Sequence, residues 1–201
     1  MKNWNEAELA AEKKKLRAQM RLARKEMTES ERKSKSSQIL HTLIHIPFFR
    51  DAEEIWCYVS LPDEVETDGI IRFCLEHGKR VAVPKVEDVT DEFGKTDSVL
   101  RFYRIRSLDD LAEGTFHVRE PVNCEPASDP DAVMILPGLA FSFEGMRMGY
   151  GRSYYDRYLL REPHPTAALA FDYSVFPDIP HEKRDVGMEY VITETRVLYC
   201  R

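Results

Sequence analysis

The 201-residue sequence has no apolar run near the roughly 20 residues that a membrane-spanning helix needs. Its first 15 residues mix acids with lysines and hold no apolar core, which argues against a secretory signal and against a transit peptide. We therefore expect a protein that does not bind membranes and that works in the cytoplasm.

Cysteine is also scarce, and its spacing excludes the usual cysteine frameworks. The four cysteines, Cys57, Cys74, Cys124 and Cys200, are scattered and form no C-x-x-C pair. Cys57 and Cys74 lie in apolar runs, where cysteine acts as a small buried hydrophobe. We therefore expect neither disulfides nor a cysteine metal site, in keeping with a reducing compartment.

Charge is unevenly distributed along the chain. The net charge is −6, yet residues 1–35 hold eleven Lys and Arg against six acids. A basic helix on an acidic body can bind nucleic acid, but interleaved aromatic side chains are missing and the pI is about 5.6. We expect no nucleic-acid partner. For the basic segment 1–35, two interpretations remain open: a solvated amphipathic helix, or a basic surface that binds an anionic small ligand.

Two capping boxes mark helix starts near the N-terminus. Asn5–Glu8 predicts a helix to about Met27, and Thr28–Glu31 predicts a second helix that Pro47 ends. In the first helix, Lys13 and Arg17 are four residues apart and share a face. Leu9, Leu16, Met20 and Ala23 form the apolar stripe, and the basic residues, Arg24 among them, are assigned to the other faces.

Apolar runs alternate with helical patterns in the rest of the chain. A helix over Asp68–His77, capped by Thr67, separates the first two of several predicted strands. These strands are 55–59, 80–83, 99–105 (parallel or antiparallel), 132–136, 166–171, 191–193 and 197–199. The segments 87–97 and 115–131 are predicted to be a surface loop and an irregular crossing.

This alternation predicts an α/β fold with a mostly parallel central sheet and helices on both faces. We expect a single domain over residues 1–201, in which N-terminal helices (1–46) precede an α/β core (54–201).

Glycine is concentrated after one buried strand. Gly145–Ser153 holds three of the nine glycines, and a helix over Tyr154–Leu160 follows it. A glycine loop before a helix can present backbone N–H groups to an anion, and Arg147 and Arg152 would add charge. The spacing matches neither common phosphate-loop motif. An ordinary strand-to-helix turn is the alternative, and spacing alone does not decide between the two.

A loop with two glutamates, Ser60–Thr67, follows the strand 55–59. Residues just past the carboxyl end of a strand in an open α/β sheet are where ligands bind. Glu64 is therefore a candidate ligand-binding residue, although solvated loop charge is the plain alternative for both Glu64 and Glu66.

Five segments together resemble one known family. They are KKKLR (13–17), LPDEVET (61–67), LPGLAF (136–141), GMRMGYGRSYYDRYL (145–159) and HEKRD (181–185). In this order they are similar to the 5-formyltetrahydrofolate cyclo-ligases, and the match covers essentially the full length. The resemblance implies a fold related to ribose-5-phosphate isomerase and the CoA-transferases. It also implies that ATP and Mg²⁺ are used to close 5-formyltetrahydrofolate to 5,10-methenyltetrahydrofolate, with release of ADP and phosphate.

The resemblance also implies site residues. The nucleotide would be bound by Lys13, Lys14, Lys15, Leu16, Arg17, Arg147, Met148, Gly149, Tyr150, Gly151, Arg152, Ser153, Tyr154 and Tyr155. The folate would be bound by Arg17, Val59, Glu64, Tyr150, Gly151, Arg152, Ser153 and Tyr154. Arg147, Arg152 and Lys13 would act on the transferring phosphate, and Asp156 and Asp185 would bind Mg²⁺. The partners would be these small molecules, and we expect a monomer.

The sequence departs from the family pattern at several positions. Ser142 stands where aspartate is usual, Met148 where leucine is, Ser153 where glycine is, and Glu189 where aspartate is. Arg152 takes a position where lysine is frequent. These departures keep open a relative that binds folate or nucleotide without turnover. An isomerase-like activity of the same broad fold is disfavoured, because it needs a positioned acid/base pair and no ATP loop.

Overall fold

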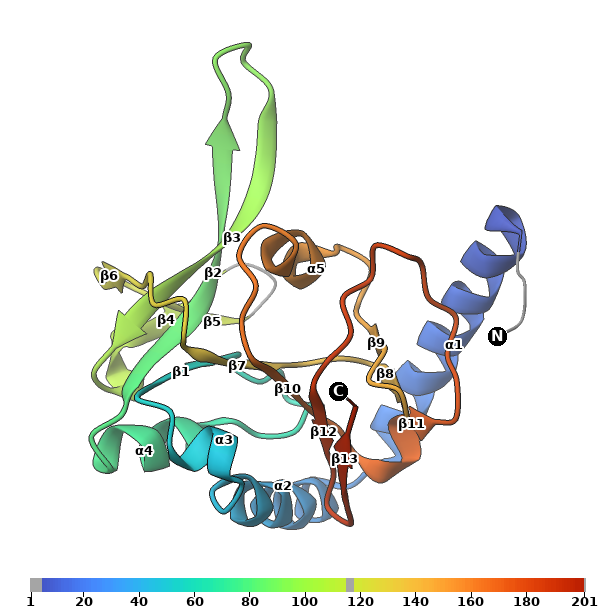
Figure 1. Ribbon diagram of the computed structural model, residues 1–201, viewed down its shortest axis with the longest axis horizontal. Helices are drawn as coiled ribbons and strands as arrows, with labels where there is room; N and C mark the ends of the chain where they lie inside the picture. The colour runs from blue at the N-terminus through green and yellow to red at the C-terminus, as the bar shows by residue number, and fades with distance from the viewer. Residues whose placement is uncertain (1–4, 115–117, 201) are drawn as a thin grey trace.

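An eight-stranded sheet runs through the centre of the computed structural model, which describes residues 5–114 and 118–200. The strand order is β13-β12-β10-β7-β1-β2-β3-β6 (Figure 1). The strands are β1 (Glu54–Cys57), β2 (Arg80–Thr90), β3 (Thr96–Ile105), β6 (Glu125–Pro126), β7 (Val133–Leu136), β10 (Thr166–Leu169), β12 (Tyr190–Ile192) and β13 (Val197–Tyr199). The five central strands from β12 to β2 pair in parallel, and β13, β3 and β6 add antiparallel edges.

Helices cover both faces of this sheet. Successive side chains of a strand point to opposite faces, and those of β1 are buried on both, so each face needs a covering layer. On one face, Ile55 and Cys57 pack with α2 (Glu29–Leu43), α3 (Pro47–Arg50) and α4 (Asp68–Glu76). On the other face, Trp56 packs with α5 (Tyr154–Leu159) through Tyr158 and Leu159. The predicted fold class is confirmed.

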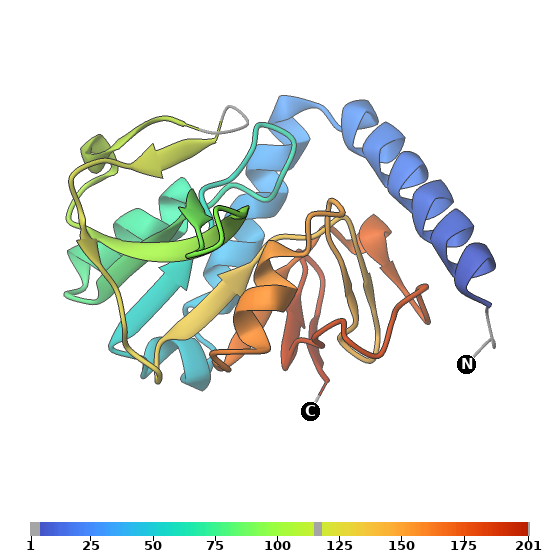
Figure 2. The same cartoon turned by 90° about the horizontal axis from the view of Figure 1, so that it is seen from above.

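The longest helix, α1 (Glu6–Glu26), lies beside a small second sheet rather than over the central one (Figure 2). This sheet has the order β11-β8-β9, formed by β8 (Ala140–Ser142), β9 (Arg147–Met148) and β11 (Val175–Phe176). Met20 is 2% exposed and packs with Leu139, Ala140, Met148 and Ile179. The apolar stripe of α1 is therefore what attaches it to the segment that follows β7.

The capping boxes predicted for the first two helices are confirmed. The Asn5 and Thr28 side chains accept hydrogen bonds from the backbone N–H groups of Glu8 and Glu31. Thr67 is the N-cap residue of α4, as predicted, but its side chain makes no capping hydrogen bond, because its hydroxyl accepts from the Ser60 N–H. Pro47 does not end α2 directly either. That helix stops at Leu43, and Pro47 begins the short α3, where its missing N–H costs nothing.

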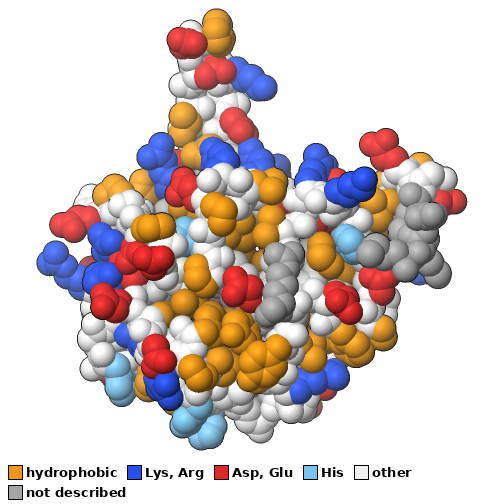
Figure 3. Space-filling view, in the orientation of Figure 1, with side chains coloured by type: hydrophobic (Ala, Val, Ile, Leu, Met, Phe, Trp, Pro, Cys, Tyr) orange, Lys and Arg blue, Asp and Glu red, His pale blue; other side chains and the backbone are white. Residues whose placement is uncertain are grey.

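The predicted surface loop 87–97 is wrong for most of its length. β2 and β3 form a long hairpin paired from Val81–Ile105 to Thr90–Thr96, and it projects from the body (Figure 1). Residues 88–97 are exposed, and the projecting part mixes acidic, basic and apolar side chains (Figure 3). A strand with solvent on both sides has no apolar face, so alternation of polar and apolar residues could not mark it.

The predicted irregular crossing 115–131 also contains paired strands. β5 (Arg119–Pro121) pairs with β4 (Leu111–Glu113), and β6 joins the sheet edge. Residues 115–117 of that prediction lie outside the described residues. The described residues also include two short 3₁₀ turns, Leu108–Asp110 and Asp172–Ser174. Among the described residues, no helix combines the length and apolar character needed to cross a membrane.

Candidate functional site

A cavity of about 440 Å³ opens beyond the carboxyl ends of β1 and β7. The chain leaves β1 toward β2 on one side and later returns to β7 on the other, so this is a topological switch point of the sheet. The lining comes from several segments: Tyr58, Val59, Leu61, Glu64, Pro84, Val86, Leu100, Val118, Glu120, Pro137, Arg147, Gly149, Tyr150, Arg152, Ser153, Tyr154, Tyr155 and Asp156.

The glycine loop borders this cavity, but it does not follow β7 directly as predicted. The β8–β9 hairpin intervenes, and the loop then runs from Gly149 to Ser153 before α5 begins. Gly151 has φ +105° and Ser153 has φ +52°, so both occupy the left-handed region. A Cβ at Gly149 would lie 3.1 Å from Arg147 Nη1, a tight contact. The glycine at 149 thus leaves room for the guanidinium beside it.

Arg147 places a buried positive charge in the cavity wall. Its Nη2 lies 3.0 Å from Asp156 Oδ2, its Nη1 donates to the Pro137 carbonyl at 3.4 Å, and its guanidinium sits 5.6 Å from the Tyr155 ring centre. The residue is 5% exposed; among the described residues Nε has no hydrogen-bond partner, and Nη2 meets Asp156 as an ion pair without hydrogen-bond geometry. A buried guanidinium with unused donors is suited to an anionic ligand.

Glu64 supplies a buried carboxylate to the same cavity. It is 4% exposed, Oε1 accepts from the Tyr150 hydroxyl at 2.6 Å, and Oε2 accepts from the Leu61 N–H at 3.0 Å. Burial raises the pKa of Glu64, while the nearby charge of Arg24 and the Tyr150 hydrogen bond act in the opposite direction. The same surroundings raise the pKa of the Tyr150 phenol, first through burial and then through Glu64. Tyr150 therefore stays a hydrogen-bond donor to the carboxylate.

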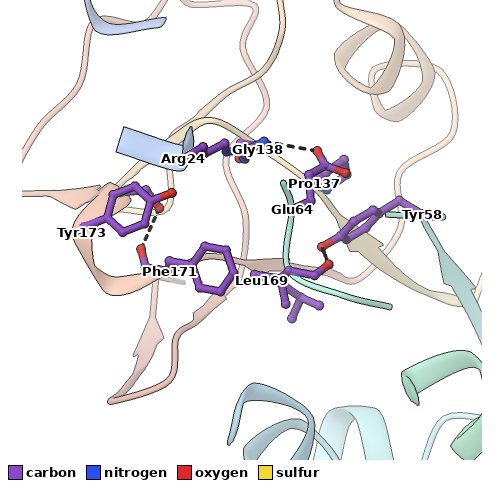
Figure 4. Close-up of a pocket in the computed structure, with 10 residues that line it drawn as sticks. Arg24, Tyr58, Glu64, Pro137, Gly138, Leu169, Phe171 and Tyr173 are labelled. Carbon is purple, nitrogen blue, oxygen red and sulfur yellow. Dashed lines mark hydrogen bonds and ion pairs between the residues drawn. The ribbon is translucent and has the colours of Figure 1, made fainter. Parts of the chain in front are cut away.

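Arg24 is a site residue that the sequence interpretation missed. It was assigned to a face of α1 outside the apolar stripe, yet it is 8% exposed and hydrogen-bonds the Tyr150 hydroxyl and, at 2.5 Å, the Gly138 carbonyl. Its Nη1 also lies 3.7 Å from Glu64 Oε1 (Figure 4). The overlooked clue is spacing: Arg24 follows Arg17 by seven residues, which is close to two helical turns.

The two predicted magnesium ligands lie on adjoining segments, each already paired with a cation. Asp156 pairs with Arg147, and Asp185 Oδ2 accepts from Lys13 Nζ at 2.7 Å. Lys13 Nζ also donates to Glu182 at 3.0 Å. The Val186 N–H donates to Asp156 Oδ1 at 3.3 Å, which joins the two segments. The described residues contain no group of three or more His, Cys, Asp and Glu that could hold a metal by itself.

The structure brings most of the other predicted residues to the cavity. Arg17 Nε donates to the Gly149 carbonyl at 3.0 Å, and the position of a Cβ on Gly151 lies 3.7 Å from Arg17 Cζ. The predicted residues that line the cavity include Val59, Tyr150, Arg152, Ser153, Tyr154 and Tyr155. Met148 and Leu16 pack in the cluster around Met20, while Lys14 and Lys15 are exposed on α1. The roles assigned to all these residues stay predictions.

The profile of the 5-formyltetrahydrofolate cyclo-ligase family matches residues 9–194. The chain belongs to this family. It is 28% identical over 200 residues to a probable 5-formyltetrahydrofolate cyclo-ligase of Caenorhabditis elegans, covering 90% of this chain and 92% of that one. It is 28% identical to the mitochondrial 5-formyltetrahydrofolate cyclo-ligase of Arabidopsis thaliana, covering 93% of this chain and 76% of that one.

A solved structure extends the likeness to the fold. The 5,10-methenyltetrahydrofolate synthetase of Aquifex aeolicus superposes with a TM-score of 0.81 at 29% identity, covering 94% of this chain and 93% of that chain. The predicted cyclo-ligase family and its fold are therefore both confirmed.

Two departures from the cyclo-ligase pattern have visible structural consequences. The Ser142 hydroxyl is fully buried and accepts from the Met146 N–H at 3.0 Å, so it closes the turn between β8 and β9. An aspartate oxygen could do the same. Ser153 holds a left-handed conformation that glycine adopts without cost and that strains a residue with a Cβ.

Proposed function

We propose that this chain catalyses the ATP- and Mg²⁺-dependent closure of 5-formyltetrahydrofolate to 5,10-methenyltetrahydrofolate, with release of ADP and phosphate. Besides the family itself, the observation that supports this most is the pair of buried, opposite charges in one cavity. Arg147 offers unused donors to an anion, and Glu64 offers a carboxylate to a neutral, N–H-rich ring. A folate joined to an activated phosphate needs both.

The folate end of the cavity is assigned to Glu64 and its apolar neighbours. A volume of about 440 Å³ lies in the range of small-molecule sites. Glu64 would accept hydrogen bonds from the pterin N–H groups, while Val59, Leu61 and Leu100 would contact the flat ring. Tyr150 and Tyr154 border the same space and would contact the substrate beside the glycine loop.

The nucleotide end is assigned to the glycine loop and the cations around it. A formyl oxygen is a poor leaving group, so we expect this oxygen to attack the γ-phosphorus of ATP and release ADP. N10 then bonds to the formyl carbon, the oxygen departs with phosphate, and N10 gives up its proton. Arg147, Arg152 and Lys13 would neutralise the transferring phosphoryl group, and the N–H groups at 149–151 would orient it. Catalysis is then mainly alignment and charge neutralisation.

The carboxylates near the loop are compatible with a nucleotide-bound magnesium ion. Mg²⁺ usually takes one or two carboxylates and completes its shell with phosphate oxygens and water, so a large acidic cluster is unnecessary. Asp156 borders the cavity, and Asp185 is on the segment that it hydrogen-bonds. Both now pair with Arg147 and Lys13, the cations that phosphate would draw away. When bound, Mg²⁺ would offset phosphate charge.

Turnover of the purified protein tests this proposal. With 5-formyltetrahydrofolate, ATP and Mg²⁺ together, we expect methenyl absorbance and ADP to rise at equal rates, and omission of any one should stop both. Asp156→Ala and Arg147→Ala should each lower turnover at least about 100-fold, because Arg147 would neutralise the transferring group and Asp156 would hold the Mg²⁺ that offsets phosphate charge. Circular dichroism and thermal melting check that both variants fold. Near-wild-type turnover in both folded variants would contradict the site.

One observation favours a second candidate, a relative that binds both ligands without closing the ring. The left-handed Ser153 places a Cβ in the loop assigned to phosphate. Binding of 5-formyltetrahydrofolate and ATP in calorimetry, with no ADP formed, would support that candidate instead. Cytoplasmic location and a monomeric state stay predictions, and the Arabidopsis relative is mitochondrial by name.

A further inference from the structure

One stripe of α1, from Lys13 to Arg24, faces the segments that build the site. Lys13, Arg17, Met20 and Arg24 are spaced by four, three and four residues, which places them on the same side of a helix. Lys13 pairs with Asp185, Arg17 reaches Gly149, and Met20 packs on the small sheet. Arg24 is the last of the four and lies nearest to Glu64, with 3.7 Å between Nη1 and Oε1.

Arg24 connects three loops that are far apart in the sequence. Its guanidinium hydrogen-bonds the Gly138 carbonyl in the turn after β7, and the Tyr150 hydroxyl in the glycine loop. It also forms ion pairs with Asp63 at 3.8 Å and Glu64 at 3.7 Å in the loop after β1. Tyr150 in turn donates to Glu64 at 2.6 Å, so the two contacts to Glu64 reinforce each other.

We propose that Arg24 is a positioning residue of the folate site, which keeps the Glu64 carboxylate charged and aimed at the cavity. This proposal rests on the proposed function, since it takes Glu64 as the group that binds the pterin. It adds an indirect role for α1 at the folate end, beside the folate contact implied for Arg17 and the nucleotide role implied for Lys13 and Arg17. The helix would thereby link the two halves of the site.

The surroundings of Glu64 show why a cation is needed there. The other ionisable groups that face it are Asp63 on its own loop, Tyr58 after β1, Tyr150 on the glycine loop and Tyr155 on α5. All of these are acids or phenols. Tyr173, in the turn after β10, faces Arg24 and Asp63 instead. Arg24 supplies the positive charge that offsets the burial of Glu64.

The packing around Arg24 leaves little room for water to replace it. The small cavity bordered by Arg24, Tyr58, Glu64, Gly138 and Tyr173 measures about 10 Å³, roughly one water molecule (Figure 4). Without the guanidinium, the Gly138 carbonyl and the Tyr150 hydroxyl would lose a partner, and Glu64 would lose its compensating charge. An unpaired buried carboxylate takes up a proton instead.

The test measures the pKa of Glu64 directly in the protein without substrate. Carboxyl ¹³C NMR of glutamate-labelled protein, assigned by comparison with Glu64→Gln, is followed through a pH titration. In Arg24→Met we expect the pKa of Glu64 to rise by about 1 to 3 units above the wild-type value. Arg21→Met is the matched control, because Arg21 is exposed on the same helix and the charge change is the same. It should leave the pKa of Glu64 unchanged.

Folate binding is then measured without ATP, by calorimetry with 5-formyltetrahydrofolate from pH 5 to pH 8. Glu64 must be ionised to accept from the pterin, so affinity falls as pH drops through its pKa. The pH midpoint should therefore rise in Arg24→Met by the same amount, with about tenfold weaker binding below the midpoint for each unit. Arg24→Gln removes the charge but keeps a donor, and it provides the same comparison if Arg24→Met does not fold.

The outcomes separate this inference from the function on which it rests. An unchanged pKa of Glu64 in a folded Arg24→Met or Arg24→Gln protein would overturn the inference, even if folate bound more weakly at every pH. If the pKa of Glu64 rises but folate affinity is unaltered throughout the pH range, the inference that Arg24 keeps Glu64 charged stands. That outcome would contradict the proposed role of Glu64 in binding the folate.

Discussion

Ser153 has a left-handed backbone conformation at a position where the family usually has glycine. Its φ of +52° lies in the left-handed region, where a Cβ crowds the following carbonyl, and its side chain makes no cap hydrogen bond to α5. The residue lines the cavity assigned to both substrates. The strained backbone of Ser153 therefore lies in the proposed binding site, and a helix-capping hydrogen bond does not compensate for it.

Replacing Ser153 with glycine should stabilise the fold. Glycine adopts this φ freely but adds entropy to the unfolded chain, so we expect a net gain of up to about 1 kcal/mol in the free energy of unfolding. Urea unfolding measures it. The matched control is Ser34→Gly, at an exposed position within α2, which should lose roughly 0.5 kcal/mol. A loss at Ser153 as large as at Ser34 would contradict the argument from φ.

The β2–β3 hairpin is the element whose projecting half contributes least to the core. Residues 88–97 are exposed, Phe93 at 87%, while Leu100 and Phe102 nearer the base are buried with Trp56. The Arg157–Asp97 ion pair joins the hairpin to α5 at 2.7 Å, but both side chains are exposed, at 41% and 62%. Such surface pairs contribute about 0–1 kcal/mol.

Shortening the hairpin should therefore leave stability nearly unchanged. If Asn-Gly replaces residues 90–96 between Val89 and Asp97, which face each other across the strands as a hydrogen-bonded pair, a two-residue turn closes the same register. We expect the free energy of unfolding to change by less than about 1 kcal/mol. Leu100→Ala, at the buried base, should by contrast cost about 2–5 kcal/mol. A hairpin deletion as costly as Leu100→Ala would mean that the tip packs on the body.

On the scale of the whole molecule, the cavity depends on the packing of distant segments. Its lining combines the loops after β1 and β7, the base of the hairpin, β5 and the start of α5. Opposite charges in that cavity, Glu64 and Arg147, are held by separate neighbours: Arg24 and Tyr150 in one case, Asp156 and Pro137 in the other. The two binding functions proposed for the cavity are therefore separable.

Ligand-induced stabilisation should reveal this separation. A ligand at about 100 times its Kd adds about 2.7 kcal/mol to the free energy of unfolding, or about 5–10 °C in Tm for a chain of this size. We expect such shifts with 5-formyltetrahydrofolate and with Mg²⁺-ATP in differential scanning fluorimetry. Glu64→Gln should lose most of the folate shift and keep the nucleotide shift, and Arg147→Ala should do the reverse. Equal loss of both shifts in each variant would argue against two distinct ends.

Local sequence patterns determined the elements and much of the candidate site. The capping boxes predicted α1 and α2, the apolar runs predicted the parallel strands, and the glycine-rich stretch marked the loop before α5. These features could be predicted because hydrogen bonds within a turn and the burial of alternate residues depend on near neighbours. Glu64 was identified for the same reason, by its place just past a strand.

Only the tertiary structure decided which charges meet. Arg24 and Tyr150 are 126 positions apart, and Lys13 and Asp185 are 172 apart, so no local pattern could pair them. The hairpin was missed because its outer half has no buried face, and the β8–β9 hairpin because its strands are too short to show a period. A buried charge is costly unless it is paired, and its partner can come from any part of the chain that packing brings close. Packing is a property of the folded chain.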